Sequence, residues 1–220
     1  MTKKGKSENV QVILRVRPLN KSERERGAKD ITTMHLSDGG IQVAGAGVDE
    51  RVWTFDAVYT NAFSQKDVYL QSIHSVVETV LQGYNATIFA YGQSGTGKTY
   101  SMCGNLEVLE QQGIIPHALN HIFETITTAS SDKLEYNVMA SFVELYNGKC
   151  RDLLVDGRLN LELKENMQKL FYVKDLTLHD VKTTRHAMEL MESGLSRREV
   201  KSTNLNADSS RSHSLFTLYV

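Results

Sequence analysis

Hydrophobic periodicity along the chain predicts a series of strands. Apolar residues alternate with polar ones over 10–16, which predicts a half-buried strand that stops at Pro18. The same alternation over 134–142 predicts a long strand that ends near 147–148. A short apolar run at 86–91 precedes a glycine-rich loop, and its composition predicts a buried central strand.

Helical spacing predicts three helices between and after these strands. Ser64 and Asp67 form a capping-box pattern, after which apolar residues recur at helical spacing until Gly83. Pro116 stands where a second helix begins, and a third is expected over 184–200. Strands and helices alternate around the glycine-rich loop, so the predicted fold is α/β, with a mixed, mainly parallel sheet flanked by helices.

Length and composition narrow the class of protein. The 220 residues suit one domain over 9–220, preceded by a basic, solvated tail at 1–8, with loops and short edge strands over 21–50. Hydrophobic residues make up 40% and charged residues 23%, near the globular average, which disfavours disordered, collagen-like and coiled-coil proteins. No apolar run approaches the roughly 20 residues of a membrane span. The net charge of -1 gives no signature of nucleic-acid binding.

A few reactive side chains lie outside these patterns. Cys103 and Cys150 cannot form a disulfide framework, and we expect buried free thiols in a reduced compartment. His117 and His121 share a helical face that could hold a metal, but the sequence shows no third ligand, so a solvated face is preferred. Residues 23–26 are expected to be a solvated charge run.

The strongest motif is the loop of residues 92–99, which fits the phosphate-loop pattern G-x-x-x-x-G-K-[ST] throughout. Its glycines let successive N–H groups point inward toward an anion, and Lys98 can neutralise phosphate oxygens. Thr99 offers a hydroxyl to Mg²⁺, which prefers oxygen ligands. A glycine-rich turn with an incidental lysine is the alternative, but the preceding apolar run and the following helix formers favour a nucleotide site. The expected phosphate-binding residues are Gly92, Gln93, Ser94, Gly95, Thr96, Gly97, Lys98 and Thr99.

Four sequence blocks resemble the kinesin motor family. They are RVRPLN at 15–20, IFAYGQSGTGKT at 88–99 with Ser101 and Met102, SFVELYN at 141–147 followed by RDLL, and NADSSRSH at 206–213. The blocks occur in family order, and their conjunction is far more specific than a phosphate loop alone. The resemblance implies a P-loop NTPase fold of kinesin type, with ATP or ADP and Mg²⁺ as cofactors.

The resemblance also implies roles for residues around the base. Arg15 and Pro18 are expected on one face of the adenine, because a guanidinium plane and a proline ring both stack on a flat base. Tyr100 is expected on the other side, where the family often has histidine. Two alternatives stay open: a surface aromatic for Tyr100 and a solvent-facing strand residue for Arg15.

The block at 206–213 matches the family's switch I. The resemblance implies that Ser210 binds the metal, Ser209 positions the attacking water and Asn206 holds the closed loop. Arg211 is expected to bridge to a glutamate of switch II. Arg198, before this block, is expected either to assist switch I or to be a solvated helical arginine.

The resemblance implies a microtubule partner, with Lys149 and Lys169 as contacts to acidic tubulin, and a place on the cytoplasmic microtubule cytoskeleton. The sequence ends at Val220 without the D-L-A-G-S-E motif of switch II, so we expect the front two-thirds of an ATP-hydrolysing motor. The alternative is a nucleotide-binding or interaction module that does not hydrolyse ATP. We expect at best weak ATP binding and negligible hydrolysis from these residues alone.

Overall fold

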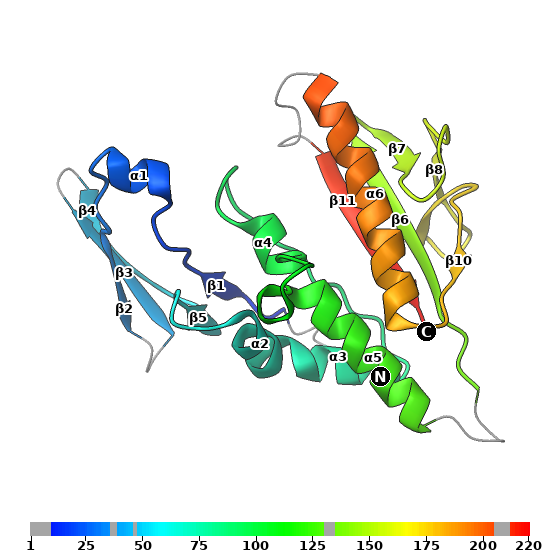
Figure 1. Ribbon diagram of the computed structural model, residues 1–220, viewed down its shortest axis with the longest axis horizontal. Coiled ribbons are helices and arrows are strands. Elements are labelled where there is room, and N and C mark those ends of the chain that lie inside the picture. The colour runs from blue at the N-terminus through cyan, green and yellow to red at the C-terminus, as the bar shows by residue number, and fades with distance from the viewer. Residues whose placement is uncertain (1–9, 36–38, 46–47, 130–134, 205–211) are drawn as a thin grey trace, which may run out of the picture. The chain divides into compact units, whose positions relative to one another are not determined.

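The structure is a computed structural model, and it describes residues 10–35, 39–45, 48–129, 135–204 and 212–220 (Figure 1). The chain divides into two compact units. The first comprises Met1–Ser75 and Ala90–Ile114, and the second Val76–Phe89 and Ile115–Val220. The phosphate loop belongs to the first unit, and the chain around switch I belongs to the second.

Two small sheets organise the first unit. Its strands are β1 (Ile13–Arg15), β2 (Thr32–His35), β3 (Gly40–Gly45), β4 (Val48–Thr54) and β5 (Ala57–Tyr59). β1 pairs in parallel with β5, while β2, β3 and β4 form a three-stranded antiparallel sheet. The predicted first strand is therefore confirmed over a shorter range, and a sheet replaces most of the expected loops at 21–50.

Helical segments follow the capping signals closely. α1 (Lys21–Glu25) comes between β1 and β2, and the chain after β5 forms α2 (Gln65–Val68), a π-helical turn at Tyr69–Ile73 and α3 (His74–Leu81). Ser64 caps α2 and exchanges hydrogen bonds with Asp67, which confirms the predicted capping box. The phosphate loop leads into α4 (Lys98–Met102), and a 3₁₀ turn follows at Leu109–Gln111.

The predicted central strand at 86–91 is wrong: these residues carry no strand within the described chain. Phe89 and Tyr91 are 76% and 94% exposed. An apolar run indicates a tendency to be buried, but a strand exists only where neighbouring strands supply hydrogen-bond partners.

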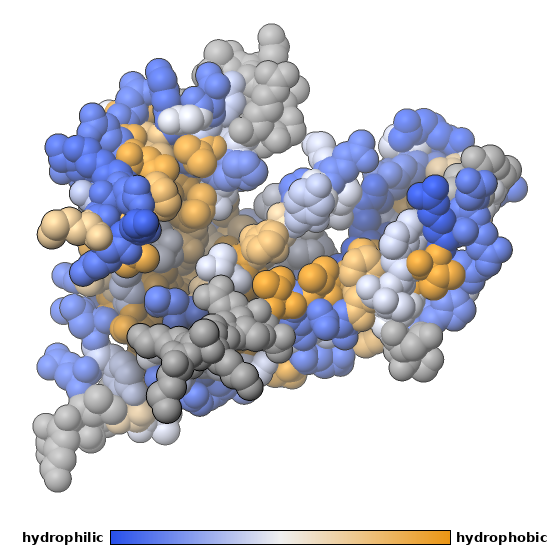
Figure 2. Space-filling model, turned by 180° about the vertical axis from the view of Figure 1, so that it is seen from behind, coloured by the Kyte–Doolittle hydropathy of each residue, from blue (hydrophilic) through white to orange (hydrophobic). Residues whose placement is uncertain are grey.

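Apolar patches are visible on one face of the molecule among hydrophilic residues (Figure 2).

The second unit is built around strand β6 (Met139–Tyr146). Its other strands are β7 (Lys149–Asp152), β8 (Leu163–Glu165), β9 (Phe171–Val173), β10 (His179–Asp180) and β11 (Ser212–Tyr219). β6 pairs antiparallel with β7, β10 and β11, and β8 pairs with β9. Asn147 and Gly148, both at positive φ, form the two-residue turn between β6 and β7, as their type predicts.

Two long helices cover this sheet. α5 (Ile114–Ala129) contains Pro116 in its first turn, and α6 (Thr184–Asn204) lies along β6 and β11 in Figure 1. Both helices confirm the predicted periodic segments, and α6 extends slightly further than expected. The core cluster brings the two helices and β6 together through Leu119, Phe123, Val138, Ala140, Val181 and Ala187.

The expected mixed sheet architecture with flanking helices is present, but parallel pairing among the described strands is confined to β1 and β5. Cys103 and Cys150 are buried thiols that form no disulfide, as predicted, and burial raises the pKa of the Cys150 thiol. Within the described residues, no helix combines the length and apolar character that crossing a membrane would require.

Candidate functional site

The phosphate loop takes a path that depends on its glycines. Gly97, which caps α4, has φ 96°, a conformation that residues with a Cβ rarely adopt. At Gly92 an added Cβ would lie 2.7 Å from Thr96 Oγ1, so a larger residue would displace that hydroxyl. Thr96 Oγ1 in turn donates to Gln93 O at 2.9 Å, which closes the loop on itself.

The lysine of this loop faces the loop's own main chain. Lys98 Nζ donates to Gly92 O and to Gln93 O, each at 2.9 Å. The ammonium group is thus held beside the loop rather than extended into solvent. Hydrogen bonds between charged partners are roughly twice as strong as neutral ones, so a phosphate oxygen competes well for these donors. The geometry fits an anion-binding loop whose cation is already in place.

The predicted base-binding residues are brought together in a particular way. The Arg15 guanidinium carbon lies 5.2 Å from the centroid of the Tyr100 ring, so the two side chains stack directly on each other. Tyr100 remains 49% exposed. Because the two side chains contact each other directly, the space between them cannot hold a flat base, and only the exposed part of the Tyr100 ring is accessible to one.

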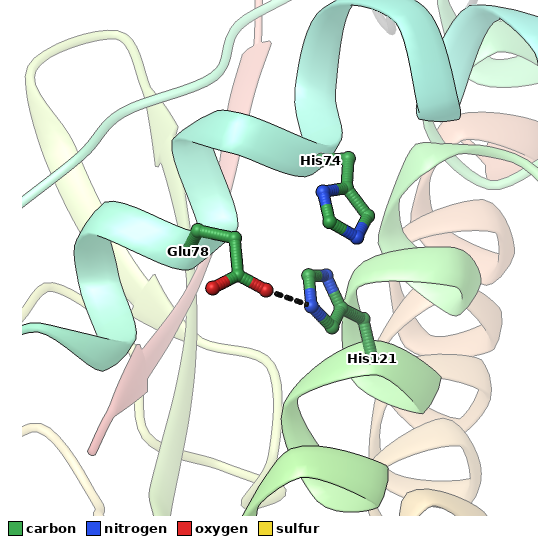
Figure 3. Close-up of side chains that lie close together, drawn as sticks. All are labelled: His74, Glu78 and His121. Atoms are coloured by element: carbon green, nitrogen blue, oxygen red, sulfur yellow. Dashed lines mark hydrogen bonds and ion pairs between the residues drawn. The ribbon is translucent and has the colours of Figure 1, made fainter.

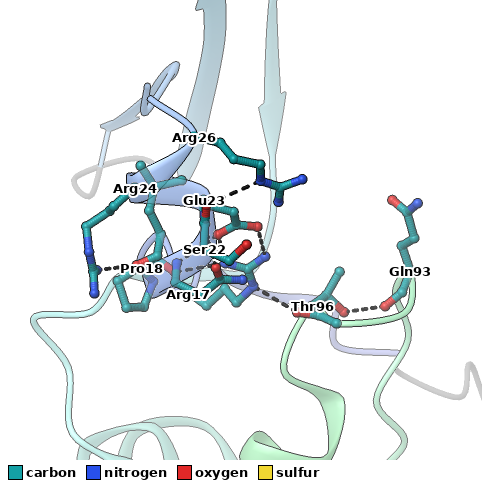
Figure 4. Close-up of polar contacts among 11 residues, drawn as sticks. Arg17, Pro18, Ser22, Glu23, Arg24, Arg26, Gln93 and Thr96 are labelled. Atoms are coloured by element: carbon teal, nitrogen blue, oxygen red, sulfur yellow. Dashed lines mark hydrogen bonds and ion pairs between the residues drawn. The ribbon is translucent and has the colours of Figure 1, made fainter. Parts of the chain in front are cut away.

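Arg17 is a residue of this site that the sequence analysis missed. Its Nε donates to Gly95 O in the phosphate loop at 2.9 Å, and its two terminal nitrogens bind the Glu23 carboxylate at 2.7 and 2.6 Å (Figure 4). Glu23 also completes a capping box with Asn20 at the start of α1. The charge run at 23–26 is therefore not merely solvated, because Glu23 is paired with Arg17 and connected through it to the phosphate loop.

Gln65 is a second missed residue. Its side chain accepts a hydrogen bond from Arg15 Nη1 at 2.7 Å and donates to Tyr100 O at 2.8 Å. One sequence feature could have indicated Gln65: it is a glutamine at the first position of a helix whose following turn is apolar. The apolar spacing indicates that this end of the helix is buried, but it does not indicate which groups the Gln65 amide binds.

The expected switch I residues Asn206, Ser209, Ser210 and Arg211 lie outside the described residues, and their roles stay predictions. The chain on either side of them is described. Arg198, on α6, donates to Ser212 O and Oγ at 3.2 and 3.0 Å and to Ser214 Oγ at 3.2 Å. Its side chain is 23% exposed, so Arg198 is not a solvated helical arginine. It fastens α6 to the beginning of β11.

Glu144 on β6 places a carboxylate between two arginines. One oxygen lies 3.4 Å from Arg151 Nη1 and the other 3.4 Å from Arg198 Nε, while the Glu144 side chain is 12% exposed. Arg151 also donates to Arg197 O at 2.8 Å. The network connects β6, β7 and α6, and Arg198 extends it to the start of β11.

Two further expectations can be placed. Lys149 and Lys169 are exposed, at the start of β7 and in the turn between β8 and β9, and their contact with tubulin stays a prediction.

The prediction that His121 lies on a solvated helix face is wrong. Its side chain is 14% exposed, and its Nε2 lies 2.7 Å from Glu78 Oε1 of α3, so the histidine has an acidic partner (Figure 3).

Comparison with known proteins agrees with the motifs. The family model described as kinesin motor domain matches residues 15–220. The kinesin-like protein KIF3C of Bos taurus is 40% identical over 219 residues, covering 97% of this chain and 27% of that protein. The kinesin-like protein klp-20 of Caenorhabditis elegans is 39% identical over 217 residues, covering 97% of this chain and 33% of its own length.

A solved structure shows the same fold. It is described as "Structure of a fast kinesin: Implications for ATPase mechanism and interactions with microtubules", and it matches 95% of this chain and 58% of its own with a TM-score of 0.89 at 37% identity. The present chain thus spans about a third or less of the length of the curated relatives quoted above. The family model nevertheless extends from the last residue of β1 to the end of β11. This chain belongs to the kinesin motor-domain family.

Proposed function

We propose that this chain is the ATP-binding part of a microtubule-dependent motor that hydrolyses ATP. The observation that carries the proposal is the closed loop 92–99 with the Lys98 ammonium held against Gly92 O and Gln93 O. Membership of the kinesin family makes ATP, rather than another phosphate ligand, the expected occupant. The proposed place of action is the microtubule cytoskeleton of the cytoplasm.

In this proposal the loop binds the phosphates, and Lys98 exchanges its two carbonyl partners for β- and γ-phosphate oxygens. Thr99 and Ser210 provide hydroxyl ligands for Mg²⁺, which would neutralise phosphate charge. Ser209 positions water for in-line attack, and Asn206 and Arg211 hold the switch closed. Such a site accelerates phosphoryl transfer by positioning and electrostatic stabilisation.

The microtubule is the proposed partner. Lys149 and Lys169 offer exposed positive charge on the second unit, which suits an acidic filament. Charge reversal at both positions should weaken sedimentation with microtubules, and the effect should fade as ionic strength rises. Unchanged co-sedimentation at low salt would remove these two lysines from the proposed contact.

Calorimetric titration with MgATP and MgADP tests the nucleotide site. Lys98→Ala should weaken binding by about 10- to 100-fold, because a charged hydrogen-bond donor to phosphate contributes about 1.5–3 kcal/mol. Lys66→Ala is the matched control, since Lys66 is an exposed lysine of α2 in the same unit. Equal affinities for Lys98→Ala and the unaltered chain would refute the assignment.

Turnover is a separate question from binding. A phosphate-release assay with and without microtubules distinguishes the ATPase from the alternative of a module that binds nucleotide without hydrolysis. We expect negligible release from these 220 residues and microtubule-stimulated release from a full-length motor that contains them. Stimulated turnover by the 220 residues alone would contradict the first expectation.

A further inference from the structure

Gln65 occupies a buried junction in the first unit. It is the first residue of α2 and is 4% exposed. Its Oε1 accepts from Arg15 Nη1 at 2.7 Å, and its Nε2 donates to Tyr100 O at 2.8 Å and to Gln111 O at 3.2 Å. A single amide thus joins β1, α2, α4 and the 3₁₀ turn, using its acceptor and both donors.

These partners matter because two of them form the stack described above. Arg15 lies over the Tyr100 ring, and the same Nη1 that donates to Gln65 also donates to Ser101 Oγ at 3.2 Å. Arg15 is half-buried, and this burial lowers the pKa of its guanidinium. Gln65 binds the cation through one end of its amide and the main chain of the aromatic residue through the other.

We propose that Gln65 is a positioning residue for the base-binding end of the nucleotide site. It holds Arg15 against one face of the Tyr100 ring and so presents the opposite face to a flat base. The inference rests on the proposed nucleotide-binding function. Gln65 acts through Arg15 and Tyr100 and has no contact with the phosphate loop among the described hydrogen bonds.

In this proposal, Gln65 affects the contacts to the base but not the contacts to the phosphates. Loss of the Gln65 amide should weaken ligands that carry a base and leave a bare polyphosphate unaffected. A general loss of folding would weaken both kinds of ligand. The ratio of the two affinities therefore distinguishes positioning from a purely structural role.

The test compares MgATP with magnesium tripolyphosphate by calorimetric titration. Gln65→Met removes all three hydrogen bonds while keeping a similar shape, and it should weaken MgATP by about tenfold, a part of what base stacking contributes. Tripolyphosphate affinity should stay within about twofold. Gln82→Met, at an exposed glutamine, should change neither affinity.

Arg15→Met provides a second, independent measurement. If Gln65 acts by holding Arg15, the single Arg15→Met variant should show the same selective loss, and the double variant should be little worse than either single variant. Equal losses for both ligands in Gln65→Met, or unchanged MgATP affinity, would overturn the proposal. Additive losses in the double variant would also overturn it.

Lys98→Ala separates failure of this inference from failure of the proposed function. That variant should weaken MgATP and tripolyphosphate alike, because Lys98 belongs to the phosphate end. If Lys98→Ala weakens both ligands but Gln65→Met weakens neither, the nucleotide site stands and the role of Gln65 falls. If a full-length motor that contains the unaltered chain binds neither ligand, both proposals fall.

Discussion

Arg17 ties the phosphate loop to Glu23. Its Nε donates to Gly95 O at 2.9 Å while its terminal nitrogens hold both carboxylate oxygens of Glu23, at 2.7 and 2.6 Å. Glu23 also accepts from the main-chain N–H of Asn20 at 2.8 Å. One arginine therefore connects the curl of the loop to the capped start of α1.

The first prediction concerns pH. Hydrogen bonds from Arg17 and from the Asn20 main chain lower the pKa of Glu23 from 4.5 to about 2. Because the fold favours the ionised form, the stabilisation is fully present above about pH 4.5 and is lost as pH falls toward about 2. Glu23→Gln should therefore reduce the free energy of unfolding at neutral pH, with the deficit narrowing below pH 4.5.

Urea unfolding of both proteins between pH 2 and pH 7 would measure that difference. Glu25→Gln serves as the control, since Glu25 faces Lys21 at 3.9 Å and both side chains are largely exposed. Its effect should be small at every pH. A Glu23→Gln deficit that stayed constant down to pH 2 would exclude the titration of Glu23 as its cause.

Close packing of α6 against β6 gives a second prediction. A Cβ at Gly194 would lie 2.3 Å from Phe142 Cδ1, and Phe142 is only 3% exposed. Gly194→Ala should lower the free energy of unfolding by about 1–3 kcal/mol, although alanine favours helices by about 1 kcal/mol. Ser196→Ala, at an exposed position of the same helix, should be neutral or slightly stabilising. Stabilisation by Gly194→Ala in thermal unfolding would show that the ring moves aside freely.

Asp152 supplies a third prediction. Its side chain is 1% exposed, and its two oxygens accept from Leu154 N at 2.8 Å and Thr177 N at 3.0 Å. Asp152→Ala should cost about 1–3 kcal/mol for each buried N–H left without an acceptor. Asp156→Ala, which removes a largely exposed partner of Arg197, should cost no more than about 1 kcal/mol. Similar losses for the two variants in denaturant titrations would contradict the assigned role of Asp152.

The carboxylate of Glu144 leads to a fourth prediction. Arg151 and Arg198 both face this carboxylate. Glu144→Ala should therefore lower the free energy of unfolding more in the unaltered chain than in a chain that already carries Arg198→Ala. The expected coupling is about 0.5–3 kcal/mol. The exposed pair Arg185 and Glu189 is the control cycle and should couple by no more than about 0.5 kcal/mol. Zero coupling between Glu144 and Arg198 would mean that their 3.4 Å approach contributes nothing.

Features that depend on residues close together in the sequence were predicted correctly. Ser64 and Asp67 form the expected capping box, and β6 ends next to Asn147-Gly148, where a strand end was expected, because each feature depends on residues a few positions apart. The periodic segments that became α5 and α6 are also confirmed. The strand expected at 86–91 failed because strand formation depends on partners that a hydrophobic run does not specify.

In the candidate site, too, features set by neighbouring residues could be predicted, and contacts between residues far apart in the chain could not. Loop 92–99 could be recognised from its spacing, but the anchors Arg17 and Gln65 depend on pairings with residues far along the chain. No local pattern indicates that Arg17 binds Gly95 O or that Gln65 binds Tyr100 O. Those contacts arise only when the tertiary structure brings β1, α2 and α4 together.

The two neighbours of β6 have different consequences for the order of folding. β7 follows β6 across a two-residue turn, whereas β11 pairs with the full length of β6 from Ser212 to Tyr219 after a long stretch of intervening chain. Closing the larger loop has the greater entropic barrier, so contact order favours the hairpin as the early event and β11 as the late one. Amides of β11 should consequently gain protection from pulsed hydrogen exchange after those of β7.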